Sequence, residues 1–179
     1  MSHTFHSTVL REYDIRGVIG ETLGPDDARA IGRGFATLLL RAGGKKVAVG
    51  YDGRVSSTIL EEALVEGLTA SGADVVRIGM GPTPMLYYAE AVEGVDGGIQ
   101  ITGSHNPANY NGFKMVFQGR PFFGDDIQEL GRMAAAGDWL AGQGQTEHRE
   151  VLVAYVDRLV EGLDGIADET LAGFRIGWD

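Results

Sequence analysis

One loop segment carries most of the side chains that could do chemistry. Residues 102–114 (TGSHNPANYNGFK) directly follow a buried strand pattern and offer a hydroxyl at Ser104, an imidazole at His105, an amide at Asn106 and an ammonium at Lys114. The Asn-Pro and Asn-Gly pairs predict two turns and therefore a loop of defined shape. Loops at the strand ends of α/β sheets bind ligands, and this set of groups suits a phosphate.

The same loop allows two other interpretations. The Asn, Pro and Gly residues could simply form a turn that leaves Ser104 solvated. Ser104 and His105 could also be a hydrolytic nucleophile and base, but adjacent side chains normally point apart and the chain has no G-x-S-x-G elbow. We therefore expect His105 to hydrogen-bond within the loop or to contact a phosphate.

A second polar cluster lies at residues 11–17 (REYDIRG). Arg16 could clamp a phosphate through two N–H groups, and Tyr13 could pack against a sugar or donate a hydrogen bond. The alternative is an ion pair between Asp14 and Arg16 that fixes this N-terminal arm. A further turn at 52–54 (DGR) is interpreted as structural, with its arginine reaching toward the site.

The composition excludes several classes of function. The 179-residue chain has no cysteine, which rules out disulfides, thiolate catalysis and cysteine-bound zinc. It carries 15 basic and 25 acidic residues, a net charge of −10, which argues against nucleic acid as a partner. The sequence holds no complete metal-ligand motif, no targeting segment and no membrane-spanning run, so we expect a cytoplasmic protein without a membrane partner.

Apolar periodicity predicts the elements that position these groups. Helices are expected at 25–42, 58–71, 83–92 and 124–136, and strands at 46–50, 74–80, 97–102 and 112–117. Thr58 and Glu61 match a capping box at the start of the second helix. The alternation predicts an α/β domain with a mixed, mostly parallel four-stranded sheet. Its last strand is antiparallel, because the loop before it is too short for a helical crossover.

The pattern changes after residue 136. Residues 137–148 (GDWLAGQGQTEH) are glycine-rich and lack a period, which is typical of a linker. A strong apolar helix face follows at 152–163, and residues 174–178 (FRIGW) have the pattern of a strand start. These features indicate either a second α/β unit that is cut short or a last strand that joins the first sheet.

Four segments together resemble the α-D-phosphohexomutase superfamily, and within it the bacterial phosphomannomutase/phosphoglucomutase group. They are REYDIRG at 11–17, YDGR at 51–54, GMGPTPMLYY at 79–88 and TGSHNPANYNGFK at 102–114. The likeness runs in order along nearly the whole chain, and the last segment is highly specific. One departure is Tyr51, where relatives often carry a basic residue.

The resemblance implies a fold and a reaction. Residues 1–149 would form a three-layer αβα domain that carries a phosphoserine, and residues 150–179 a linker helix and the first strand of a truncated second α/β domain. The implied activity is an intramolecular phosphotransferase, an isomerase that interconverts hexose 1-phosphates and hexose 6-phosphates of mannose, glucose or both. The phosphoserine gives its phosphoryl group to a sugar hydroxyl, and the bisphosphorylated intermediate reorients and returns the other phosphate.

The resemblance also implies roles for individual residues. Ser104 would carry the phosphoryl group and supply one Mg²⁺ ligand, the other ligands lying outside this chain. Further implied are catalytic roles for Lys114, Arg16 and His105 and substrate-binding roles for Tyr13 and Asn106.

The implied partners are small-molecule phosphosugars, hexose 1,6-bisphosphate as an activator, and the missing C-terminal domains of the same polypeptide. Without those domains we expect little or no mutase activity, and the choice between mannose and glucose is not encoded in these residues. The alternative is a non-catalytic phosphosugar-binding module with the same fold.

Overall fold

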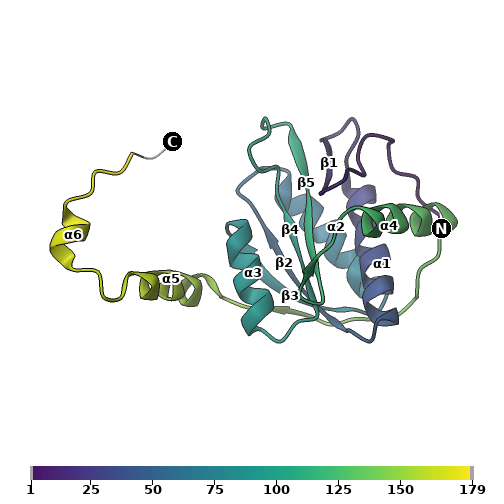
Figure 1. Ribbon diagram of the computed structural model, residues 1–179. Coiled ribbons are helices and arrows are strands. Elements are labelled where there is room, and N and C mark those ends of the chain that lie inside the picture. Colours follow the sequence, from purple (N-terminus) through teal and green to yellow (C-terminus); the bar gives the residue numbers. More distant parts are fainter. Residues whose placement is uncertain (1, 178–179) are drawn as a thin grey trace.

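A mixed β-sheet organises the chain in the computed structural model, which describes residues 2–177 (Figure 1). Its seven strands within these residues are β1 (Ile15–Val18), β2 (Lys46–Tyr51), β3 (Asp74–Met80), β4 (Gly97–Ile101), β5 (Tyr110–Phe117), β6 (Arg120–Pro121) and β7 (Thr146–His148). Their order is β1-β5-β4-β2-β3-β7, and β6 pairs with β5. β2, β3, β4 and β7 run parallel, whereas β5 runs antiparallel to β1, β4 and β6.

Helices cover both faces of this sheet and make a three-layer fold (Figure 1). The helices are α1 (Pro25–Arg41), α2 (Ser57–Ala70), α3 (Thr83–Val92), α4 (Asp125–Ala136), α5 (Leu152–Val160) and α6 (Asp168–Ala172), with a 3₁₀ turn at Glu161–Leu163. Successive strand side chains alternate between faces. Val47 and Val49 therefore pack with α1, α2 and α4, while Ala48 packs with α3.

The predicted α/β class and the four predicted strands are confirmed, but the sheet has seven strands and not four. The predicted strands are β2 to β5, and their apolar runs place them at the centre of the sheet. β1, β6 and β7 have four, two and three residues and were missed, because strands this short show no alternation of apolar residues.

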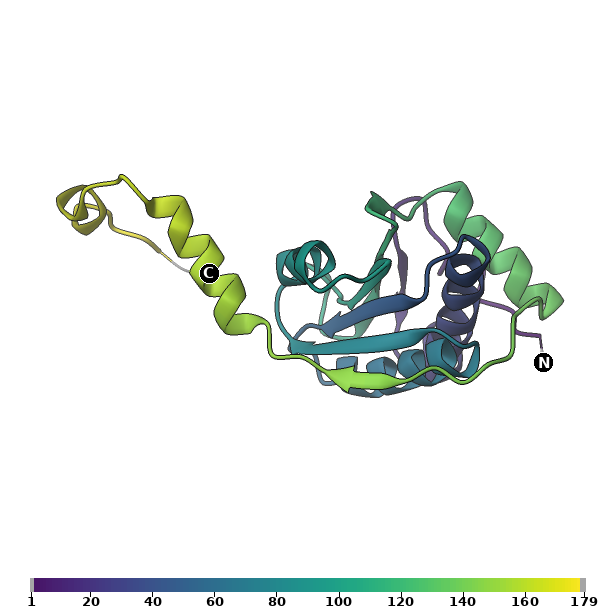
Figure 2. The same ribbon diagram turned by 90° about the horizontal axis from the view of Figure 1, so that it is seen from below.

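The segment predicted as a linker is partly a strand. Residues 146–148 form β7, which runs beside β3 at the edge of the sheet (Figure 2). The chain before it is also attached, because the Gly142 and Gly144 N–H groups donate to carbonyl oxygens of α2 at 3.0 and 2.9 Å. These contacts are made by backbone atoms, so they leave no trace in the side-chain pattern.

The predicted capping box at Thr58 and Glu61 is wrong. Helix α2 already begins at Ser57, whose hydroxyl donates to Asp52 at 2.6 Å. Glu61 is 1% exposed and instead accepts a hydrogen bond from Arg77 on β3, with Nε–Oε1 at 2.7 Å. Glu61 therefore forms a partly buried ion pair with Arg77, 16 residues away in the sequence, in place of the local cap.

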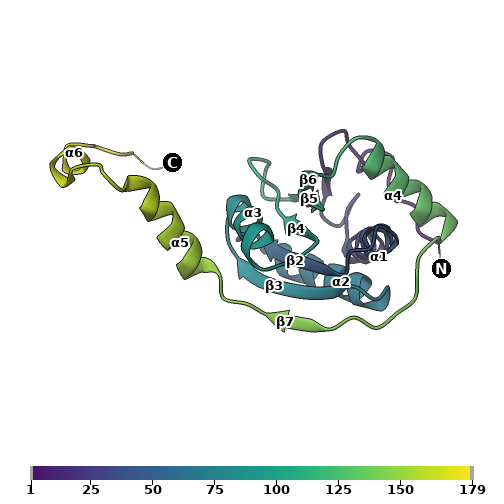
Figure 3. The same ribbon diagram turned by 60° about the horizontal axis from the view of Figure 1, so that its bottom comes forward.

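The C-terminal segment leaves the sheet after β7, and α5 and α6 extend away from the three-layer domain (Figures 1 and 3). The start of α5 still contacts α3, where the Tyr155 and Tyr88 ring centroids are 5.8 Å apart. The predicted helix at 152–163 is present as α5 and the 3₁₀ turn. The strand predicted at 174–178 is absent from residues 174–177, which pair with no strand among the described residues, and residue 178 lies outside them. Among the helices of residues 2–177, none combines the length and apolar character needed to cross a bilayer.

Helices α1 and α2 cross in close backbone contact, which we predict to be sensitive to a single methyl group. A Cβ at Gly67 would lie 2.2 Å from the Arg29 carbonyl oxygen on α1. Gly67→Ala should therefore lower the free energy of unfolding by about 2 kcal/mol, even though alanine favours helix. Urea unfolding measures this, with Gly162→Ala as control because its Cβ meets no atom within 4 Å. Equal stability of the two variants would contradict the predicted clash.

Candidate active site

The loop between β4 and β5 presents Ser104 to solvent at one edge of the sheet. The turn after β2 lies against it, as expected for chain ends that leave neighbouring strands at the same edge. Ser104 is exposed and has a φ of +51°, an unusual backbone conformation for a residue other than glycine. Its N–H donates to the Thr102 hydroxyl at 2.9 Å, and its own hydroxyl makes no hydrogen bond that would draw it into the protein core.

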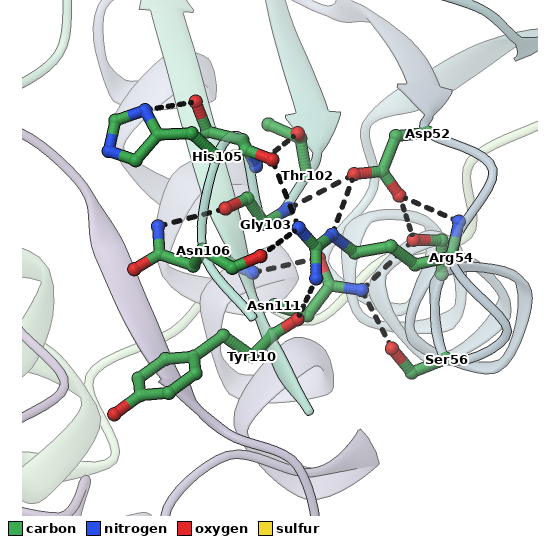
Figure 4. A network of polar contacts seen from close by, with 12 residues as sticks. Asp52, Arg54, Ser56, Thr102, Gly103, His105, Asn106, Tyr110 and Asn111 are labelled. Atoms are coloured by element: carbon green, nitrogen blue, oxygen red, sulfur yellow. Dashed lines mark hydrogen bonds and ion pairs between the residues drawn. The ribbon is translucent and has the colours of Figure 1, made fainter. Parts of the chain in front are cut away.

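The Arg54 guanidinium holds this loop (Figure 4). Its two terminal nitrogens donate at 2.7–3.0 Å to the carbonyl oxygens of Ser104, Asn106, Pro107 and Tyr110. Its Nε lies 3.2 Å from a carboxylate oxygen of Asp52. A guanidinium has five N–H groups in a fixed plane, so Arg54 uses its donors on the loop and on one acid. Gly103 makes room for it, because a Cβ there would lie 2.3 Å from the guanidinium carbon.

Asp52 anchors the start of the same loop. One carboxylate oxygen accepts the Gly103 N–H at 3.1 Å, and the other accepts the Ser57 hydroxyl at 2.6 Å and the Arg54 N–H at 3.1 Å. Burial alone would raise the pKa of Asp52. The hydrogen bonds from Ser57, Arg54, Thr102 and Gly103 outweigh that effect and hold its pKa below the ordinary value of 3.8.

Two asparagines complete the network. Asn106 donates from its side-chain amide and from its backbone N–H to the Gly103 carbonyl oxygen, at 2.9 and 3.0 Å, which closes a tight turn. Asn111 is fully buried and donates to the Ser56 and Ser57 hydroxyls, both at 2.9 Å. The turn predicted at residues 111–112 is therefore wrong, because these residues belong to β5 and Asn111 connects it to the start of α2.

His105 lies beside Ser104, with its Nδ1 3.5 Å from the Ser104 hydroxyl. This distance is at the limit for a hydrogen bond. Within residues 2–177 no carboxylate is bonded to the His105 ring, so the third group that orients a catalytic base is missing. The geometry does not support a serine hydrolase.

Arg16 and Tyr13 lie on the arm predicted to reach the site. Arg16 is in β1, opposite Gly112 of β5, and its guanidinium pairs with the buried Asp14 carboxylate. This ion pair is the predicted alternative for Arg16. Tyr13 is 77% exposed and stacks on Phe123, with ring centroids 6.4 Å apart.

Lys114 lies on β5 and lines a pocket of about 320 Å³. The pocket also contains Tyr13, so two of the predicted site residues meet there, while Ser104 is not among its lining residues. Within residues 2–177 the Lys114 ammonium takes part in no ion pair or hydrogen bond.

The structure adds residues that the sequence analysis did not place in the site. Asp52, Ser56, Ser57 and Asn111 shape the loop, and Phe123 joins Tyr13 in the pocket. The signal for Asp52 was its position directly after a buried strand, as for residues that follow β4. Ser56 and Phe123 had no such signal, because their partners are distant in sequence.

A complete metal site does not fit this network. The residues 2–177 contain no group of three or more histidine or acidic side chains able to hold a metal ion. Both oxygens of Asp52, the carboxylate of this loop network, accept hydrogen bonds from protein donors. The loop therefore offers one candidate Mg²⁺ ligand, the side-chain oxygen of Ser104.

Comparisons with known proteins agree with this architecture. The family described as phosphoglucomutase/phosphomannomutase, alpha/beta/alpha domain I, matches residues 7–141. A phosphomannomutase/phosphoglucomutase of Pseudomonas putida is 42% identical over 86% of this chain and 33% of its own length. A phosphoglucomutase of Neisseria gonorrhoeae is also 42% identical, over 85% of this chain and 34% of its own.

A solved structure of the same family also matches this chain. The crystal structure of a phosphoglucomutase/phosphomannomutase family protein from Burkholderia thailandensis superposes with a TM-score of 0.84 and 44% identity, covering 88% of this chain and 36% of that one. The chain thus belongs to the phosphoglucomutase/phosphomannomutase family, and residues 7–141 are its α/β/α domain I. It spans about a third of the length of these relatives.

We predict that Arg54→Lys loosens the loop without unfolding the domain. An ammonium has one nitrogen and cannot reach four carbonyl oxygens, so stability should fall by about 2 kcal/mol. The Asn106 and Tyr110 N–H groups, which bond within the loop, should exchange with deuterium faster. Arg132→Lys is the matched control, because Arg132 makes an exposed pair with Glu129. Unchanged exchange of the loop amides would rule out Arg54 as the residue that holds the loop.

The lowered pKa of Asp52 predicts a pH dependence of stability. A carboxyl whose pKa is lower in the folded state stabilises the fold above its unfolded pKa, and this contribution is lost as the pH falls through the folded value. The difference in unfolding free energy between wild type and Asp52→Asn should therefore be constant near neutral pH and shrink in acid below about pH 4.

Urea unfolding at a series of pH values measures that difference. Asp157→Asn, at an exposed position, controls for the change in net charge. A gap between wild type and Asp52→Asn that stays constant down to the acid limit of folding would show that Asp52 has no lowered pKa.

Proposed function

We propose that this chain is the phosphoserine-bearing domain of a phosphohexomutase that interconverts the 1-phosphates and 6-phosphates of mannose, glucose or both. The single observation that carries the proposal is the Ser104 hydroxyl, exposed at the edge of the sheet on a loop whose carbonyl oxygens are fixed by Arg54. Family membership and the names of the relatives support the same reaction class.

In the proposed reaction the Ser104 Oγ donates the phosphoryl group and later receives one back. A sugar hydroxyl oxygen forms a new bond to phosphorus, the bond from phosphorus to the Ser104 Oγ breaks, and the hydroxyl proton ends on Oγ. The bisphosphorylated sugar then turns round and its other phosphate returns to Oγ by the reverse exchange. The protein contributes position and charge, which are the main contributions to catalysis of phosphoryl transfer.

The neighbouring side chains have roles that follow from the donors they retain. The Lys114 ammonium stabilises charge on the transferring group, and His105 contacts the phosphate beside Ser104. Arg16 keeps N–H groups beyond the one that it gives to Asp14 and turns them toward the anionic substrate. Tyr13 packs against the sugar, and Asn106 keeps its side-chain oxygen for a sugar hydroxyl.

The family resemblance implies a metal ion, an activator and a division of the chain into two units. A phosphorylated Ser104 would give one oxygen ligand to Mg²⁺, an ion that offsets negative charge on a phosphoryl group. Hexose 1,6-bisphosphate would phosphorylate Ser104 and so activate the enzyme. Residues 1–149 form the phosphoserine domain and residues 150–179 belong to a second α/β unit, a division supported by the exposed apolar side chains of α5.

We predict that incubation with glucose 1,6-bisphosphate adds one phosphoryl group to the chain and that Ser104→Ala abolishes the addition. The reason is that Ser104 is the exposed hydroxyl of the fixed loop. Intact-mass analysis gives the result, and Ser7→Ala, at another exposed serine, is the control. Reversible sugar phosphate binding without an adduct would instead support a non-catalytic phosphosugar-binding module.

A further inference from the structure

A groove runs along β5 between α3 and the segment around β6. One part of the groove is the pocket of about 320 Å³ that contains Lys114, and a second pocket of about 360 Å³ adjoins it. The two share Tyr87, Met115 and Pro121 among their lining residues. Lys114 pairs with Gln100 of β4, so it lies on the sheet face that α3 covers.

The positively charged side chains near Ser104 differ in whether their charged groups already have partners in the protein. Arg54 is taken up by loop carbonyl oxygens and Asp52, and Arg16 pairs with Asp14. Within residues 2–177 the side-chain ammonium of Lys114 makes no ion pair or hydrogen bond. An uncompensated ammonium in a pocket favours an anionic ligand locally, even though the chain as a whole has a charge of −10.

Three aromatic rings line the same pocket as that ammonium. Tyr13, Tyr87 and Phe123 are 77%, 49% and 46% exposed, and all line the Lys114 pocket. Tyr13 and Phe123 stack at an interplanar angle of 27°. Their backbones are tied together, because the Gly124 N–H donates to the Glu12 carbonyl oxygen at 2.7 Å. Exposed rings gathered at one site mark a binding surface.

The groove begins within reach of the Ser104 loop. The Thr102 N–H donates to the Gly112 carbonyl oxygen at 2.9 Å, and Lys114 follows Gly112 by two residues on β5. Two strand residues span roughly 7 Å, which is about the length of one sugar ring. A ligand in the pocket therefore lies within about one sugar length of the strand ends that carry the Ser104 loop.

We propose that Phe123 and Tyr87 are specificity-determining residues that select a pyranose ring for this site. The carbon-bound hydrogens of the ring lie on the aromatic faces of Phe123, Tyr13 and Tyr87, and Lys114 binds the phosphate. The proposal rests on the proposed function for the identity of the ligand as a hexose phosphate. It adds that the aromatic rings distinguish a cyclic sugar phosphate from an acyclic phosphate of the same charge.

Chemical-shift titrations of the 179-residue chain test this with glucose 1-phosphate, glycerol 3-phosphate and inorganic phosphate. We expect glucose 1-phosphate to shift the groove amides and to bind most tightly. Phe123→Ala and Tyr87→Ala should each weaken glucose 1-phosphate roughly 3- to 10-fold, the range for loss of one ring contact, and leave inorganic phosphate unchanged. Phe123→Tyr should retain the wild-type affinity.

Phe174→Ala is the matched control, because Phe174 is an exposed phenylalanine outside the groove. The proposal is overturned if Phe123→Ala binds glucose 1-phosphate as wild type does, or loses inorganic phosphate equally. It is also overturned if glucose 1-phosphate at about 20 mM, well above a millimolar dissociation constant, shifts no groove amide.

These results are independent of Ser104 phosphorylation. Selective loss in the ring variants with no Ser104 adduct would support the pyranose site and overturn the proposed transfer reaction. An adduct on Ser104 with no effect of the ring variants would do the reverse.

Discussion

The hydrogen bonds from the Arg54 guanidinium to the 104–110 loop are the constraint on which the candidate site depends. A loop that turns its carbonyl oxygens inward needs several donors at one point, and a guanidinium supplies them in a rigid plane. Asp52 neutralises that cation, and Gly103 leaves the space for it. The result is a fixed backbone from which Ser104, at a φ of +51°, projects its hydroxyl outward.

The same arrangement separates two kinds of positive charge. Arg54 and Arg16 each have an acidic partner, but Arg54 uses its donors on the loop and on Asp52, whereas Arg16 keeps N–H groups beyond the one that it gives to Asp14. Lys114 has no such partner within residues 2–177, so its field is directed to the pocket. In a chain with a charge of −10, this division leaves a local site for an anion without requiring a basic surface.

The elements that could be predicted from the sequence are those whose signals are local. The apolar runs of β2 to β5 and the amphipathic α1 predicted the fold class, and the 102–114 segment predicted Ser104 in a loop and Lys114 on the strand that follows it. The seven-stranded sheet, the Glu61–Arg77 pair and the contacts of Arg54 were not predictable in this way. Each depends on backbone pairing or on partners 16 to 56 residues away, which periodicity does not encode.

Electrostatics explains why the loop needs both Asp52 and Arg54 if Ser104 is to carry a phosphoryl group. A phosphoserine has a charge of about −1.5 to −2 at neutral pH, and an isolated carboxylate near the loop would repel it. Asp52 is not isolated: Arg54 lies between it and the loop carbonyl oxygens, and its oxygens accept hydrogen bonds from Gly103 and Ser57. The acid can therefore anchor the backbone of the loop while its charge is compensated, which leaves the outward side of Ser104 free for an anion.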